Sequence, residues 1–219
     1  MHILITAATA AELLPALEVR EAIHSQTDNQ LFIEAVETGI GSTATAYHTL
    51  KALLTASDLP YDMAINVGIA GSFSPSLPIG SVVRIGSDYF GDCGIQTASG
   101  FESLFDARLL GADTFPFTAG KLIPAPLAQE WESALYSLPI VQGVTVQHLV
   151  ESDFFSPSPP FLTEVETMEG AAFFYVCMNE RIPCLALRAV SNSVGDRDKS
   201  RWNIPLALRN LSQVLKNCF

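Results

Sequence analysis

Short apolar segments alternate along this chain with segments that carry apolar side chains at helical spacing. The apolar segments are rich in β-branched residues and predict buried strands over 2–7, 31–38, 62–67, 80–85, 144–150 and 184–190. The segments with helical spacing predict helices over 10–23, 43–55, 170–180 and 203–218. This alternation is typical of an α/β domain around a largely buried sheet, parallel or mixed.

The composition fits one domain with subunit contacts. The 219 residues are 48% hydrophobic, which supplies a sizeable core, and no stretch has the composition of an interdomain linker. We therefore expect a single domain over residues 1–219. Charged residues make up only 16% of the chain, against roughly 25% in a typical soluble domain. This shortage indicates that part of the surface faces other subunits, so we expect a homo-oligomer, a dimer or higher.

The net charge of −11 argues against binding to nucleic acid, because an acidic surface repels phosphate backbones. It also argues against adhesion to anionic lipid, and no apolar run approaches 18 residues. No cationic segment precedes the first apolar stretch, so a signal peptide is not expected. We expect neither nucleic acid nor membrane as a partner.

The cysteines and histidines give no sign of a metal or redox centre. The four cysteines form no CxxC pair, and the four histidines have no ligand spacing. No glycine segment matches a dinucleotide or Walker motif. We therefore expect reduced thiols, no metal, no cofactor and a cytoplasmic location.

Ligands of open α/β sheets bind beyond the carboxyl ends of the strands, so the residues after each strand are the candidate site. Glu12 follows the first strand, where a carboxylate could act as a general base toward water. The alternative is an ordinary charge in the first turn of a helix, where it complements the helix dipole. Ser42 follows the glycines of 39–41 and is a candidate N-cap for the next helix.

A second glycine segment follows the strand at 62–67. Gly68, Ile69, Ala70 and Gly71 predict a turn in which the backbone can approach a ligand closely. Taken alone, such a segment is more often a simple tight turn than a binding loop.

Three further segments carry candidate ligand contacts. Met168 and Glu169 precede an apolar helix, where a buried carboxylate could accept hydrogen bonds from both hydroxyls of a ribose. Asn192 ends an apolar strand and offers both a donor and an acceptor to a purine edge. Arg197 could hold a substrate carboxylate with its two-pronged guanidinium. The simpler alternatives are a helix-end charge, a core methionine, a turn asparagine and a solvated loop.

In order and spacing, these segments resemble the methylthioadenosine/S-adenosylhomocysteine nucleosidases and their purine nucleoside phosphorylase relatives. The resemblance rests on Glu12 and on residues 39–41, 66–71, 165–171 and 188–192, and it spans almost the whole chain. It implies a three-layer α/β/α sandwich around a central mixed sheet, and an oligomer that cleaves the N-glycosidic bond of a small nucleoside.

The resemblance also implies roles for the candidate residues. Glu12 would be the base, and Glu169 would hold the ribose. Met168 and residues 68–71 would wall the site, and Arg197 would meet a carboxylate of the substrate.

Asn192 departs from the family pattern, because the adenine-specific members carry an aspartate there. An amide donates to a 6-oxo group and accepts from a protonated N7, which favours hypoxanthine over adenine as the released base. The alternatives are an adenine-releasing nucleosidase, a phosphorylase on the same fold and, from a different class, a purine-binding sensor without catalysis, against which Glu12 argues. Near residue 147 the chain also lacks the family's threonine- and glycine-rich sequence, and Phe154 or Phe155 is the candidate for the aromatic residue beside the ribose.

Overall fold

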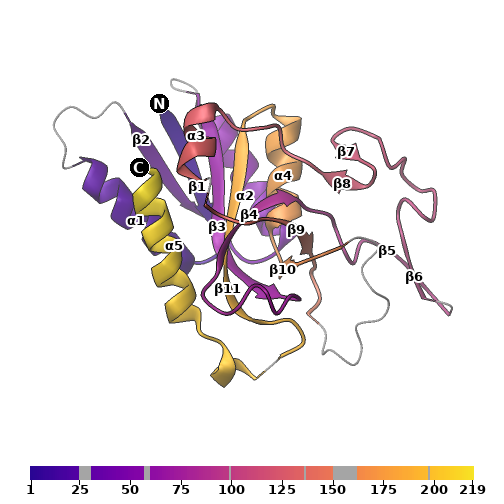
Figure 1. Cartoon of the computed structure of the whole chain (residues 1–219). Helices are drawn as coiled ribbons and strands as arrows, with labels where there is room; N and C mark the ends of the chain where they lie inside the picture. The colour runs from indigo at the N-terminus through magenta and orange to yellow at the C-terminus, as the bar shows by residue number, and fades with distance from the viewer. Residues whose placement is uncertain (25–30, 57–59, 99, 136, 150–161, 197) are drawn as a thin grey trace.

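A seven-stranded mixed sheet forms the centre of the molecule (Figure 1). The computed structural model describes residues 1–24, 31–56, 60–98, 100–135, 137–149, 162–196 and 198–219. In order across the sheet, the strands are β10 (Val165–Thr167), β9 (Ile140–Thr145), β4 (Val82–Ser87), β11 (Cys184–Ser193), β3 (Met63–Ser72), β1 (His2–Ala7) and β2 (Phe32–Glu37).

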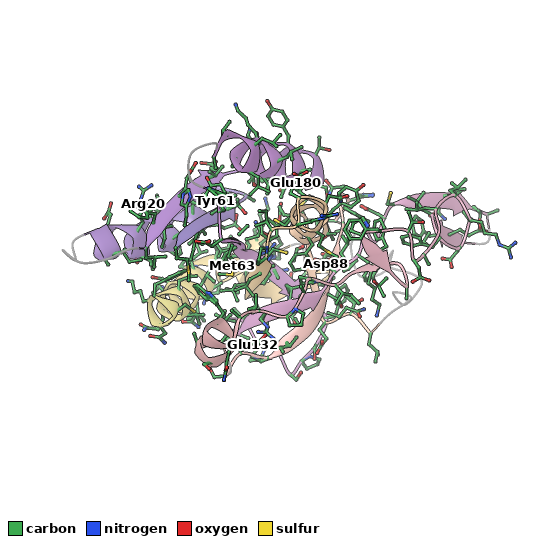
Figure 2. All side chains as sticks on the ribbon, turned by 90° about the horizontal axis from the view of Figure 1, so that it is seen from above. Arg20, Tyr61, Met63, Asp88, Glu132 and Glu180 are labelled. Atoms are coloured by element: carbon green, nitrogen blue, oxygen red, sulfur yellow. The ribbon has the colours of Figure 1, made fainter. Side chains whose placement is uncertain are left out.

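Helices cover both faces of this sheet. On one face, α1 (Ala10–His24) lies beside α5 (Ile204–Cys218), with the short α3 (Gln129–Ala134) next to α5 (Figure 1). On the other face, α2 (Ser42–Thr55) packs against α4 (Gly170–Asn179) (Figure 2). Each face has its own core of buried apolar side chains, because neighbouring strand residues point to opposite faces. Ile3 and Ile5 thus belong to one core, whereas Leu4 belongs to the other.

The sheet contains both parallel and antiparallel strands, and the antiparallel pairs determine which segments return to the carboxyl ends of the parallel strands. Neighbours β2, β1, β3 and β11 are parallel, so their carboxyl ends share one edge. β4 pairs antiparallel with β11. β10 also pairs antiparallel with the end of β3, where Val165 faces Ser72 and Glu166 faces Gly71. That second pairing turns the segment after β10 back toward the carboxyl ends of β1 and β2.

Two small hairpins lie outside the sheet. β5 (Gly94–Thr97) pairs with β6 (Gly100–Ser103), and β7 (Phe117–Thr118) pairs with β8 (Lys121–Leu122). They occupy the right-hand end of the molecule in Figure 1. Within the described ranges, no helix is both long and apolar enough to cross a bilayer.

Most predicted elements are present, but three details differ. Residues 68–71 are not a turn, because β3 continues through them with β11 paired alongside. Ser42 is not an N-cap: Gly41 occupies that position, and Ser42 is the first residue of α2. β9 begins before the predicted 144–150 segment and ends at Thr145.

Candidate active site

Glu12 lies in the first turn of α1 and is 8% exposed. Its Oε1 accepts a hydrogen bond from the backbone N–H of Ile69 at 2.9 Å. Its Oε2 accepts from the Thr9 hydroxyl at 2.8 Å. These two contacts fix the carboxylate at the carboxyl ends of β1 and β3 and leave each oxygen with a further lone pair.

Gly68 lets the Glu12 carboxylate approach β3. A Cβ at position 68 would lie 2.8 Å from Glu12 Oε1, and real Cβ atoms do not come that close to such an atom. Gly68 is ordinary strand, so the glycine serves close approach here and not an unusual backbone angle. The predicted glycine segment therefore reaches the site as an extended strand that presents Ile69 N–H.

Glu169 is the N-cap residue of α4 and is 9% exposed. Its Oε1 accepts a hydrogen bond from the backbone N–H of Gly41, at the start of α2, at 2.9 Å. Burial raises the pKa of Glu169, with the Glu12 charge adding to this, while the Gly41 N–H and the Arg188 charge act in the opposite direction. The Glu12 and Glu169 carboxylates are thus close enough to act on each other.

Arg188 is a fully buried cation in β11. Its guanidinium donates to the Asn66 carbonyl at 3.1 Å and also to the Asn66 side-chain oxygen. Burial lowers the pKa of Arg188, whereas the charges of Glu169, Glu12 and Asp88 raise it. One arginine therefore offsets three carboxyl groups, and it remains charged because the unperturbed guanidinium pKa is so high.

Asp88 is the third of these carboxyl groups and is completely buried. Its Oδ1 accepts from the Tyr89 N–H at 2.7 Å and from the Thr145 hydroxyl at 3.1 Å. Its Oδ2 has no hydrogen-bond partner among the described residues and lies against Gly170, the first residue of α4. Burial is the main cause that raises the pKa of Asp88 to about 7.

Asn192 is buried at the end of β11, opposite Gly71 of β3. Its Oδ1 accepts from the Ser191 hydroxyl at 2.8 Å, and its Nδ2 donates to the Ser193 carbonyl at 2.9 Å. The Ser193 carbonyl can only accept, so the nitrogen end of the amide must face it. One N–H and one oxygen lone pair of Asn192 then stay available to a ligand.

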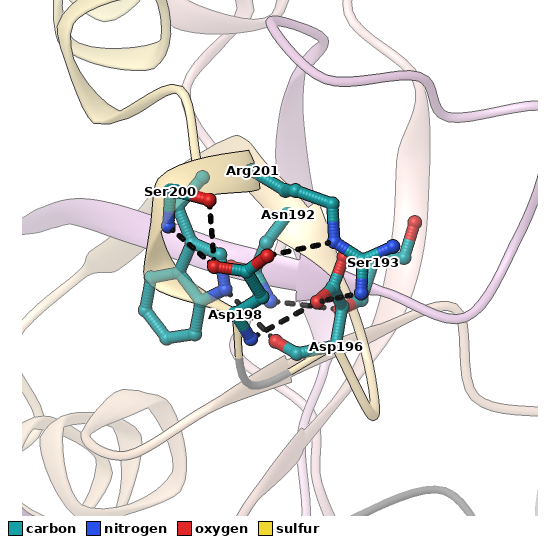
Figure 3. A network of polar contacts seen from close by, with 7 residues as sticks. Asn192, Ser193, Asp196, Asp198, Ser200 and Arg201 are labelled. Atoms are coloured by element: carbon teal, nitrogen blue, oxygen red, sulfur yellow. Dashed lines mark hydrogen bonds and ion pairs between the residues drawn. The ribbon is translucent and has the colours of Figure 1, made fainter.

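The loop after β11 folds on itself next to Asn192 (Figure 3). Asp196 accepts a hydrogen bond from Arg201 at 2.7 Å, and its carbonyl accepts from the Trp202 indole at 2.8 Å. Asp198 binds the Ser200 N–H and hydroxyl at 3.0 and 2.6 Å. Arg197, predicted to meet a substrate carboxylate, lies outside the described residues, as do Phe154 and Phe155.

Met168 contributes its backbone to the site as well as a half-buried side chain. Its carbonyl accepts from Gln147 Nε2 at 3.1 Å, and the Ser42 hydroxyl lies 3.4 Å away. The structure therefore brings the candidates together in two groups. Glu12 lies against Gly68 and Ile69, and Asn192 against Gly71. Glu169 and Met168 lie beside the start of α2.

The sequence assigned no role to Arg188, Asp88 or Gln147. A lone arginine inside the apolar strand at 184–190 is a signal that could have identified Arg188, because a buried charge needs partners. Asp88 and Gln147 carry no such signal, since their partners are distant in the sequence. Among the described residues, no cluster of three or more His, Cys, Asp or Glu side chains could hold a metal ion.

The arrangement suits proton and hydroxyl chemistry. Two buried carboxylates accept hydrogen bonds from backbone N–H groups, which keeps each oriented without using both of its oxygens fully. A nearby amide offers a donor and an acceptor. This set can activate water, hold a pair of hydroxyls and bind the edge of a heterocycle.

Comparison with known proteins identifies relatives of this chain, although no family model matches it. A futalosine hydrolase of Streptomyces coelicolor is 34% identical over 158 residues, which cover 71% of this chain and 64% of that protein. A 5'-methylthioadenosine/S-adenosylhomocysteine nucleosidase of Psychromonas ingrahamii is 28% identical over 192 residues, which cover 82% of this chain and 77% of the relative. The chain thus matches a little under two thirds of the Streptomyces protein.

The fold agrees with these relatives. The structure of futalosine hydrolase from Helicobacter pylori superposes with a TM-score of 0.78 and covers 100% of this chain and 97% of its own, at 17% identity. The predicted α/β/α architecture around a mixed sheet is confirmed. In sequence, the chain is thus similar to a futalosine hydrolase and to a methylthioadenosine/S-adenosylhomocysteine nucleosidase, and it shares the fold of the Helicobacter pylori enzyme.

Proposed function

We propose that this protein hydrolyses the N-glycosidic bond of futalosine and releases hypoxanthine and dehypoxanthine futalosine. The observation that carries the proposal is the pair of buried carboxylates, Glu12 and Glu169, each held by a backbone N–H at the same site. The bond between C1′ of the ribose and N9 of the purine breaks. A water molecule supplies the hydroxyl group that C1′ gains, and no cofactor takes part.

Glu12 acts as the general base in this proposal. It takes a proton from the attacking water while the water oxygen bonds to C1′. The Ile69 N–H and the Thr9 hydroxyl keep the carboxylate oriented. The sugar passes through an oxocarbenium-like transition state, as in glycoside cleavage in general.

Glu169 holds the ribose hydroxyls. Gly41 N–H occupies one of its oxygens once, so lone pairs remain for two hydroxyl groups. Positive charge develops on the sugar in the transition state, and a nearby carboxylate then binds it more tightly than it binds the ground state. Met168 and residues 68–71 form the walls beside the nucleoside, and Arg197 meets the substrate's carboxylate.

Asn192 assists departure of the base. Its free N–H donates to the 6-oxo group, and its oxygen accepts from N7 once that nitrogen carries a proton. The purine leaves with the electron pair of the broken bond and takes up a proton at N7 from bulk water. The proton that Glu12 removes from the attacking water returns to the solvent, so the proton count balances. An adenine-releasing enzyme would instead need a group that accepts from the 6-amino group.

Two observations favour this substrate over the alternatives. The Streptomyces relative, which is 34% identical to this chain, is named a futalosine hydrolase. The Psychromonas methylthioadenosine/S-adenosylhomocysteine nucleosidase is 28% identical to this chain. A phosphorylase must also hold phosphate, and neither the 39–43 nor the 68–72 segment contains an arginine or lysine.

The proposal extends to the setting of the reaction. The chain acts as one nucleosidase domain over residues 1–219, in the cytoplasm, on the futalosine route to menaquinone, without nucleic acid or membrane as a partner. It works as a homo-oligomer, a dimer or higher. Tyr47 and Leu54 of α2 support this, because these large apolar side chains are 60% and 66% exposed.

The test is a base-release assay. The protein is incubated with futalosine, aminofutalosine, inosine and methylthioadenosine, with and without phosphate, and the free base is identified. We expect hypoxanthine from futalosine at a rate independent of phosphate. Adenine release from methylthioadenosine alone, or a requirement for phosphate, would contradict the proposal.

A further inference from the structure

Gln147 follows β9 and joins three segments that are far apart in the sequence. Its Oε1 accepts from the Ser42 N–H at 2.8 Å. Its Nε2 donates to the Ser42 hydroxyl at 2.9 Å and to the Met168 carbonyl at 3.1 Å. One side chain therefore ties the start of α2 to the residue that precedes Glu169, although the side chain itself is exposed.

Gln147 also contacts Gly41, and this contact connects it to the Glu169 carboxylate. A Cβ at position 41 would lie 2.9 Å from Gln147 Oε1, so the amide rests directly on Gly41. Gly41 also has a φ of 90°, which favours glycine. The N–H of this same residue donates to Glu169 Oε1. Gln147 thus sets the position of both the donor, through Gly41 and Ser42, and the acceptor, through Met168.

The backbone of Gln147 is itself anchored. The N–H groups of Gln147 and His148 both donate to Asp92 Oδ2, at 2.5 and 3.0 Å. A charged acceptor makes these hydrogen bonds stronger than neutral ones. The side-chain amide of Gln147 therefore extends from a backbone that Asp92 holds in place, although β9 has already ended at Thr145.

From this geometry we infer that Gln147 is a positioning residue for the reaction: it aligns the Glu169 carboxylate with the ribose hydroxyls by clamping the first residues of α2 to Met168. The inference rests on the proposed function, since it needs Glu169 to hold the ribose. Glutamine is suited to this role because the Ser42 N–H needs an acceptor and the Met168 carbonyl needs a donor. A carboxylate would meet the first need and repel the second.

The test uses Gln147→Glu, which keeps the shape of the side chain, and the isosteric apolar variant Gln147→Met. The control is Gln142→Glu in β9, the strand that precedes Gln147, which adds the same charge next to Lys121, outside the site. Steady-state kinetics are measured on futalosine and on its 2′-deoxy analogue, and thermal melting of each variant checks that it folds.

We expect Gln147→Glu to lower kcat/KM on futalosine by about tenfold or more. The Met168 carbonyl then loses the Gln147 donor and keeps only the longer hydrogen bond from the Ser42 hydroxyl, so the Glu169 carboxylate shifts. On the 2′-deoxy analogue the loss should be less than about threefold, since part of the hold on the ribose is already absent. Gln147→Met should behave similarly, and the Gln142→Glu control should match wild type on both substrates.

Equal losses on the two substrates would overturn the inference, because they would indicate a general structural defect. Unchanged kinetics in both Gln147 variants would overturn it as well. A wild-type protein that releases no base from futalosine would instead overturn the proposed function, and this inference with it. The failures are distinguishable because wild type is measured first, on both substrates.

Discussion

Glu12 and Glu169 are both buried carboxylates at one site, yet the chain surrounds them in different ways. Glu12 is held by the neighbouring Thr9 and by a backbone N–H of the central strand β3. Glu169 occupies the N-cap position of α4, lies near the Arg188 charge, and has a pKa that burial raises. This difference fits the proposed division of tasks, with Glu12 as the base near the sheet and Glu169 as the residue that holds the sugar at the helix end.

The largest expected effect comes from breaking the Glu12 half. Gln at position 12 keeps the shape of the side chain but cannot accept the proton of water. We expect Glu12→Gln to lower kcat on futalosine by about 10²–10⁴-fold, the usual contribution of general base catalysis. The change in KM should be small. Near-normal turnover of a pure, folded Glu12→Gln protein would show that Glu12 is not the base.

Breaking the Glu169 half should cost less. Glu169→Gln retains one acceptor oxygen but loses the charge that stabilises the developing cation. We expect kcat/KM on futalosine to fall about 10- to 100-fold, with KM rising as well as kcat falling. The variant should also be compared with Glu12→Gln at several pH values. Loss of kcat alone, with KM unchanged, would argue against contact with the ground-state ribose.

Asn192 is the residue proposed to contact the purine, and its exchange tests which purine the enzyme releases. Asn192→Asp introduces the residue that the resemblance assigns to adenine-specific nucleosidases. We expect the ratio of kcat/KM for futalosine over aminofutalosine to fall by at least about tenfold. The aspartate has no N–H to donate, so an acceptor oxygen then faces the 6-oxo group. An unchanged ratio would show that Asn192 does not determine which purine is released.

The smallest expected effect concerns the helix end behind Glu169. The pKa of Asp88 is raised to about 7 from an ordinary 3.8. The folded protein then binds a proton that the unfolded chain releases, so stability is lost as pH rises from about 4 to about 7. Chemical denaturation across this range should show a weaker pH dependence in Asp88→Asn than in wild type. An identical slope in both proteins would contradict this reading of Asp88.

The long elements were predictable from the sequence because their side-chain periods are local. The closing helix is an example: it was predicted over 203–218, and α5 spans Ile204–Cys218 with Asn203 as its N-cap. The predicted turn at 68–71 was wrong because β11 on one side and β10 on the other extend β3 through these glycines. Such pairing joins residues that are distant in the sequence and leaves no periodic signal.

The site was predictable in part for the same reason. Glu12, Glu169 and Asn192 follow strands or precede a helix, so a rule about strand ends identifies them as candidates. Ser42 was assigned to a cap, yet Gln147 satisfies its N–H, and the Ser42 hydroxyl accepts a hydrogen bond from Gln147 and lies near the Met168 carbonyl. Asp88 depends on Thr145 and on Gly170, which only the folded chain brings beside it.

The division of roles between the two carboxylates is tested most directly by one comparison of substrates. Wild type, Glu12→Gln and Glu169→Gln are each assayed on futalosine and on its 2′-deoxy analogue. The account predicts that Glu12→Gln loses the same factor on both substrates, whereas Glu169→Gln loses far less on the deoxy analogue than on futalosine. Equal losses for Glu169→Gln on the two substrates would contradict the account.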